Sequence, residues 1–426
     1  MTSVGLRLDQ APPFSVPLRF FLTAPLFGAA AAIVVLIEGP EIFLSRWHPT
    51  LLAVTHLLTL GVLTMVMLGA LMQMLPVLAG IPVRRPVGVA AVVHALLVVG
   101  TITIALSFWS SFTALRAVGL ITLGIGVGIF FLVAGESLAR AVANPSVTAM
   151  RLALLAFAVV ALLGIYTGSP WAPTQASLAL RVTDAHLVWG LVGWVALLII
   201  GVAYQVVPMF QLTRAYPTWL RPGLVPAVFA MLILWSGAAV VTPTSATGVE
   251  ITIALFIAAA LALFAVVTLR LQMTRQRRLP DATVRFWFLA MVSLFACAAL
   301  WAVRAVGLVT DERSLILIGA WMIIGFAAST IIGMLYKIVP FLAWLHLQAR
   351  LESAAPHMKE FLPDAPALAH AWLHGAALVL LAPAIWARGP WLYPAAGALL
   401  VSFLWLGANL VRAVRVYRRF AMPIKG

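Results

Sequence analysis

The stretch GALMQMLPVL at residues 69–78 recurs in altered form as GVAYQVVPMF at 201–210 and as GMLYKIVPFL at 333–342. The offset is 132 residues each time, from 69 to 201 to 333. A fixed period of this kind marks structural repeats, and the repeat governs how the whole fold is interpreted. The sequence therefore predicts three equivalent units, at approximately 17–148, 149–280 and 281–426.

Apolar residues surround these stretches on both sides. The set AVILMFWYC makes up 64% of the 426 residues, charged residues make up 9%, and the mean hydropathy is +1.09. Water-soluble domains are about half apolar and about a quarter charged. The chain is therefore predicted to be one membrane domain over residues 1–426, with no room for a large soluble catalytic domain.

Runs of apolar residues bounded by Pro, Gly and charged residues give the number of membrane spans. A helix that crosses a bilayer needs about 20 such residues. The sequence predicts twelve spans, at 18–37, 50–77, 87–108, 113–134, 150–168, 184–209, 223–242, 249–269, 284–304, 314–343, 367–386 and 391–411. The predicted fold is all-α and polytopic, with twelve transmembrane helices in three quasi-equivalent four-helix units.

Lys and Arg are unequally divided between the two faces of this predicted bundle. All but six of the 27 lie on the face that carries both termini. The six others are Arg46, Arg116, Arg181, Arg304, Arg313 and Arg388. By the positive-inside rule, both termini are predicted to be cytoplasmic, in a bacterial-type inner membrane. The net charge of +15 thus indicates orientation, and we expect the lipid bilayer as partner and no nucleic acid.

Two other compositional features narrow the chemistry. Cys297 is the single cysteine, which excludes internal disulfides, thiolate-ligated iron–sulfur clusters and CxxCH haem attachment. The segment 1–17 is polar and contains proline, and the first apolar run lacks a small-residue cleavage site, so we expect no cleaved signal peptide.

The repeated stretches also share glycines upstream. Gly61, Gly193 and Gly325 match in the same register, as do the glycines that open each stretch. Their spacing places them near one face of a helix, where glycine lets a neighbouring helix approach closely. We interpret these positions as repeated helix packing without chemistry. Lys337 stands where the other copies have glutamine, and its role stays open.

His56 and His186 are the first candidate site residues. They lie near the outer ends of spans 2 and 6, five and seven residues before the matched Gly61 and Gly193. Two histidines at similar depth in equivalent helices can converge on one cofactor through Nε2. The alternative is that each ring only hydrogen-bonds a neighbouring helix. Both interpretations remain open at this point.

A second group of histidines lies in spans 3 and 11. His94 and His374 each follow a proline by eight residues, Pro86 and Pro366. His370 precedes His374 by one helical turn, and an i, i+4 histidine pair is a spacing typical of metal ligands. We take His94 and His374 as candidate cofactor ligands, and His370 with His374 as a weaker candidate metal site. The alternative for the pair is an interfacial polar cluster.

Span 2 carries the pattern H-x4-G-x7-G-x3-Q-x2-P, which starts at His56 and ends at Pro76. Together with the matching Gly and Pro of span 6, this pattern resembles helices two and six of haem-copper oxidase subunit I, especially its cbb3-type branch. The NnrS family of haem- and copper-binding membrane proteins, linked to nitric-oxide stress, is similar in size and span count. The resemblance covers most of the chain as architecture, but its motifs cover only spans 2 and 6.

The resemblance implies roles for individual residues. His56 matches the histidine that ligates the low-spin haem, and His186 matches a ligand of the active-site copper. The span-10 histidines of the family are replaced by Ile318 and Ala320, and its adjacent His-His pair has no counterpart between 221 and 250. No tyrosine matches the family's cross-linked tyrosine. Oxidase activity and proton pumping are therefore not expected.

These observations lead to one leading hypothesis and two alternatives. The leading hypothesis is a non-pumping, haem-copper oxidase-like membrane protein that binds haem, with or without copper. It would handle a diatomic gas such as nitric oxide or serve respiratory electron transfer, with respiratory-chain subunits as partners. The alternatives are an accessory or assembly subunit without cofactor, and a permease for metal, haem or a small solute.

Overall fold

In a computed structural model of the chain, the described residues are 10–79, 83–110, 112–241, 248–276, 279, 281–351, 354–387 and 389–421. Most of them are helical, and these ranges contain no β-strand. The α-helices are α1 (Ser15–Glu38), α2 (Pro49–Leu58), α3 (Met65–Ala79), α4 (Pro86–Trp109), α5 (Thr113–Arg140), α6 (Pro145–Gly168), α7 (Ala176–Val188), α8 (Leu197–Gln211), α9 (Leu220–Val241), α10 (Gly248–Met273), α11 (Ala282–Ala305), α12 (Glu312–Ala320), α13 (Ser329–Leu351), α14 (Met358–Phe361), α15 (Asp364–Trp386) and α16 (Leu392–Ala421). Short connecting segments are the 3₁₀ turn η2 (Pro40–Phe43) and the π-helices η3 (Thr59–Thr64), η4 (Trp189–Ala196) and η5 (Trp321–Ala328).

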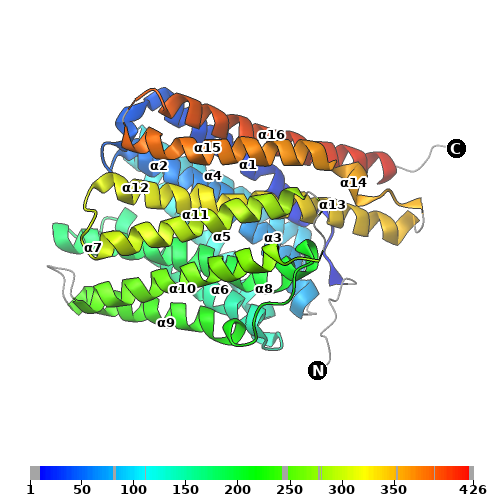
Figure 1. The fold of residues 1–426 in the computed structure, drawn as a ribbon, viewed down its shortest axis with the longest axis horizontal. Helices are drawn as coiled ribbons and strands as arrows, with labels where there is room; N and C mark the ends of the chain where they lie inside the picture. Colours follow the sequence, from blue (N-terminus) through cyan, green and yellow to red (C-terminus); the bar gives the residue numbers. More distant parts are fainter. Residues whose placement is uncertain are drawn as a thin grey trace.

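Twelve helical spans in the described ranges are long and apolar enough to cross a membrane. Nine are single helices, and three consist of two α-helices joined by a π-helix. Each of the twelve predicted spans overlaps one of them in order, so the all-α, twelve-span prediction is confirmed. The helices run side by side along the long axis of the bundle (Figure 1).

The bundle has two ends, which we call the termini end and the far end. The termini end carries the start of α1 and the end of α16, and the far end carries the connection from α1 to α2 (Figure 1). Five of the six basic residues assigned to the opposite face lie at the far end, and Arg388 lies outside the described residues. Which end faces the cytoplasm stays a prediction.

The three composite spans form the centre of the bundle. In their most apolar windows 67%, 83% and 72% of the residues are buried, against 22–56% in the nine single-helix spans. Their π-helices contact one another, since η5 touches both η3 and η4. Trp194 Nε1–H of η4 donates to Thr64 Oγ1 of η3 at 3.2 Å. The nine other spans pack around this central group.

The matched glycines lie where the central spans meet their neighbours. A Cβ at Gly69 would stand 2.7 Å from Phe20 Cβ of α1, and one at Gly333 would stand 2.8 Å from Phe286 Cβ of α11. At Gly201 it would collide with Ala149 of α6. All three contacts join the second span of a predicted unit to its first span. The prediction that these glycines allow close helix packing is therefore confirmed.

The π-helices recur in the same register as the repeated stretches. η4 and η5 begin and end 132 residues apart, and η3 occupies the last six positions of the same window. A π segment is rare and shifts the helix faces on its two sides relative to each other. Each composite span can therefore present one face near the far end and another near the termini end. The equivalence of whole four-helix units stays a prediction.

Candidate functional site

A cavity of about 480 Å³ occupies the far-end half of the bundle. Its walls are mostly apolar and come from the central spans together with α1, α4, α5, α6, α15 and α16. Both His56 and His186 line it. A volume of this size falls in the range of about 300–1,000 Å³ that is typical of ligand pockets.

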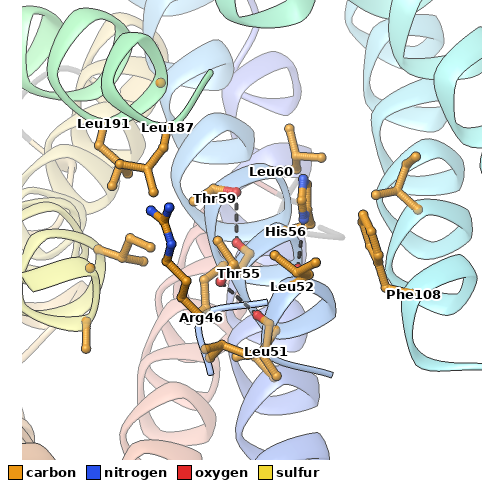
Figure 2. Close-up of a pocket in the computed structure, with 18 of the residues that line it drawn as sticks. Arg46, Leu51, Leu52, Thr55, His56, Thr59, Leu60, Phe108, Leu187 and Leu191 are labelled. Atoms are coloured by element: carbon orange, nitrogen blue, oxygen red, sulfur yellow. Dashed lines mark hydrogen bonds between the residues drawn. The ribbon is translucent and has the colours of Figure 1, made fainter. Parts of the chain in front are cut away.

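His56 lies on α2, two turns into the second span. Its Nδ1 is 2.7 Å from the carbonyl oxygen of Leu52, one turn earlier on the same helix. The ring points toward Phe108 of α4 (Figure 2) and stacks on it, with ring centroids 5.3 Å apart and an angle of 24°. The guanidinium of Arg116 lies 5.3 Å from the centre of the same Phe108 ring. The orientation of His56 is thus determined by one hydrogen bond and one aromatic contact.

His186 lies on α7, two residues before that helix passes into η4. Its Nδ1 is 3.0 Å from the carbonyl oxygen of Val160 on α6. The ring fits against Gly164 of the same helix, where a Cβ would stand 2.9 Å from His186 Cε1. The absence of a side chain at Gly164 therefore leaves the space that the imidazole occupies.

The structure brings these two predicted site residues together. Their ring centroids are 6.5 Å apart and their planes differ by 23°. A carbonyl oxygen only accepts hydrogen bonds, so both Nδ1 atoms carry the proton, and the lone pair of each neutral ring resides on Nε2. Neither Nε2 has a hydrogen-bond partner among the described residues. The pair can therefore offer two nitrogen ligands to a metal in the cavity.

Three charged residues in the cavity wall were not among the predicted site residues. Arg46, from the connection before α2, pairs with Asp184 of α7 at 2.7 Å. Arg116 also lines the cavity, and its buried Nε has no hydrogen-bond partner in the described part of the chain. The available signal was that Arg46 and Arg116 belong to the few basic residues of their face, and that Asp184 precedes His186 by two residues.

His370 and His374 lie in a different environment, between α13, α15 and α16. Both rings are fully buried. His370 Nδ1 is 2.6 Å from Tyr336 Oη and its Nε2 is 2.7 Å from Ser402 Oγ. His374 Nδ1 is 3.0 Å from the same Ser402 Oγ, and its Nε2 is 3.0 Å from Ser329 Oγ. All four ring nitrogens are therefore engaged by side chains.

The protons of this group can be assigned one after another. Ser329 O–H donates to the carbonyl oxygen of Ile324, so Ser329 Oγ must accept from His374 Nε2–H. His374 Nδ1 then accepts from Ser402 O–H, and Ser402 Oγ accepts from His370 Nε2–H.

The assignment continues to the other end of the group. His370 Nδ1 accepts from Tyr336 O–H, and Tyr336 Oη accepts from Asn409 Nδ2–H at 2.9 Å. Every bond runs in the same direction, and every histidine is neutral.

This arrangement corresponds to the interfacial polar cluster, one of the two interpretations left open for His370 and His374. Binding a metal there would require at least one of these hydrogen bonds to break. Within the described ranges, no group of three or more His, Cys, Asp or Glu side chains is placed to hold a metal ion. Metal binding by His370 and His374 stays a prediction. Neither ring has a nitrogen free to act as a ligand.

His94 lies apart from both groups. Its Nε2 is 2.9 Å from Thr23 Oγ1 of α1, and the Thr23 hydroxyl donates to the carbonyl oxygen of Arg19. Neither His94 nor His374 lines the cavity that contains His56 and His186. Of the four predicted cofactor ligands, the structure therefore brings two together and leaves two elsewhere.

No family model matches the chain, and no curated protein sequence is significantly similar to it.

Proposed function

We propose that this polytopic membrane protein binds haem in the far-end cavity, with His56 and His186 as the iron ligands. The observation that carries the proposal is the pair of neutral imidazoles whose unbonded Nε2 atoms belong to one largely apolar cavity. The backbone carbonyls that hold both Nδ1–H groups supply the support that metal-ligating histidines usually have.

The charges and volume of the cavity agree with such a ligand. Arg116 provides a cationic group that can offset a carboxylate of a haem, while the apolar walls suit its ring. The ring centroids of His56 and His186 are 6.5 Å apart, so one group bound in the cavity can reach both rings. The residues present therefore fit the group.

The function that follows is electron transfer to a respiratory partner when both histidines hold the iron, or binding of a diatomic gas such as nitric oxide when one of them is released. When bound, haem would supply a redox-active iron that can bind a gas or transfer an electron. The protein's own residues hold and orient the group, and the apolar walls exclude water. Ala320 lines the cavity where an oxidase would present a further histidine, so dioxygen reduction is not part of the proposal.

The test is an absorption spectrum with metal analysis on protein purified after expression with added haem. We expect a Soret band that is lost or shifted in His56→Ala and in His186→Ala. His94→Ala is the matched control, since its ring lies outside the cavity, and should leave the band unchanged. A purified protein without a Soret band, or a band that neither cavity variant alters, would overturn the proposal.

Two other outcomes are informative. If the purified protein contains copper and no haem, and both cavity variants lose the copper, then the two histidines bind copper in place of haem, because imidazole also suits copper. A protein without either metal that co-purifies with respiratory subunits, or that moves a solute into vesicles, would favour the accessory or permease alternative.

A further inference from the structure

The helix that carries His186 has little support from apolar packing. Of the 13 residues of α7, Val188 alone is buried. The helix lies at the far end of the bundle, at the left edge of Figure 1, where it joins η4. The position of His186 must therefore depend on other contacts.

One of these contacts crosses the cavity wall. Arg46 Nη1 lies 2.7 Å from Asp184 Oδ1, and both side chains line the cavity with His56 and His186. Arg46 precedes α2, the helix of His56, by three residues, and Asp184 precedes His186 by two. The ion pair is thus a direct connection between the two segments that present the histidines.

The Arg46 side chain also contacts the neighbouring Trp47. Its guanidinium lies 4.5 Å from the centre of the Trp47 ring, and it extends from the base of α2 toward Leu187 and Leu191 (Figure 2). The side chains of Arg46 and Asp184 are 23% and 35% exposed. Ion pairs with this exposure add little to overall stability, so the contribution of this one lies in geometry.

A second ion pair holds α7 from another direction and provides a comparison. Arg181 Nη1 lies 2.6 Å from Glu250 Oε2, in the first turn of α10. Glu250 is almost completely buried, and neither residue lines the cavity. This pair secures α7 to α10 but does not reach the segment that carries His56.

We propose that Arg46 and Asp184 are positioning residues, which set the distance between His56 and His186. The inference rests on the proposed function, in which both histidines serve one cofactor. Without the pair, α7 retains its contacts to α6 and α9 and its ion pair to α10. Among the described residues, Asp184 and His186 have no other hydrogen bond or ion pair to the segment at the base of α2. The two Nε2 atoms would then occupy a range of separations, and shared metal ligation would weaken.

The first measurement needs no cofactor. His56→Cys and His186→Cys are combined in a Cys297→Ser background, and the two thiols are joined with a short thiol-specific cross-linker. We expect Arg46→Gln or Asp184→Asn to slow cross-linking by about fivefold or more. The exchanged pair, Arg46→Asp with Asp184→Arg, should restore the rate. Arg140→Gln, which breaks an exposed ion pair within α5, is the control and should leave the rate near that of the parent.

The second measurement uses the haem-loaded protein with its native histidines. We expect Arg46→Gln and Asp184→Asn to shift the absorption bands toward five-coordinate iron, and the exchanged pair to reverse the shift. An unchanged cross-linking rate in both single variants would overturn the positioning role. Altered cross-linking in a protein that never binds haem would keep the positioning role and overturn the proposed function.

Discussion

His56 and His186 differ from His370 and His374 in what surrounds their ring nitrogens. The first pair lines a cavity and uses one nitrogen of each ring on a backbone carbonyl. The second pair is fully buried, and all four of its ring nitrogens are hydrogen-bonded to the hydroxyl groups of Ser329, Tyr336 and Ser402. From the sequence, the first pair was the leading candidate for cofactor binding, and the i, i+4 spacing of the second made it a weaker candidate metal site. The hydroxyl groups on neighbouring helices therefore decide whether a buried histidine keeps a free lone pair.

The largest contrast between the two pairs should appear in stability. His370→Ala removes the acceptor of Tyr336 O–H and the donor to Ser402 Oγ, so we expect a loss of about 3 kcal/mol, because each buried unsatisfied group costs about 1–3 kcal/mol. His56→Ala should cost less than about 1 kcal/mol, because Leu52 keeps its helical hydrogen bond. Unfolding of the detergent-solubilised variants measures both, and equal losses would contradict the distinction.

Two tyrosines at matched repeat positions sharpen the same contrast. Tyr336→Phe leaves His370 Nδ1 and the Asn409 amide without partners, and should cost about 1–2 kcal/mol in unfolding free energy. Tyr204 stands 132 residues earlier, and its buried Oη has no hydrogen-bond partner among the described residues. Tyr204→Phe should therefore be neutral or slightly stabilising. A larger loss at Tyr204 than at Tyr336 would show that the network does not stabilise α13 and its neighbours.

A change beside His186 should act on binding and leave the second pair untouched. Gly164→Ala places a Cβ 2.9 Å from His186 Cε1, so the ring must move. We expect haem or metal to bind about tenfold more weakly, as for other losses of support around a metal-ligating histidine. Titration of the purified protein measures this. Gly128→Ala is the control, since its Cβ would meet nothing within 4 Å. Equal affinities in the two variants would contradict a positioned His186.

The smallest effect on stability should occur at Lys337, which belongs to neither histidine pair. Lys337 Nζ pairs with Asp281 Oδ2 at 2.7 Å, and the two side chains are 32% and 24% exposed. Lys337→Gln restores the residue of the other two copies and should cost about 0.2–1 kcal/mol. Added salt should shrink this difference. Thermal unfolding at two salt concentrations checks it, and a loss as large as that of His370→Ala would be unexpected.

The helical architecture was predictable because it depends on local composition. Apolar runs bounded by Pro and Gly located all twelve spans, and glycine spacing predicted where central spans approach their neighbours. The near-equal depth of His56 and His186 followed from the repeat register. These properties are determined by residues close together in the chain, so the sequence alone contains them.

The partners of the histidines could not be predicted in the same way. Ser402 and Ser329 reach His374 because α16 and α13 both pack beside α15, and Arg46 reaches Asp184 across the cavity wall. Such contacts depend on which helices become neighbours, and twelve spans allow many arrangements. One signal was present in the sequence: Ser329, Ser402 and Asn409 are polar residues inside long apolar runs, where each needs a partner.

The hydrogen-bonded group from Asn409 to Ile324 also bears on the electrical insulation of the membrane. A continuous series of hydroxyls and imidazoles inside a bilayer resembles a path along which protons hop. This series ends on a backbone carbonyl, which accepts a hydrogen bond but has no proton to pass on. Its other end is an amide, which does not release protons at physiological pH. The protein can therefore keep a strongly polar interior between α13, α15 and α16 without dissipating a proton gradient through it.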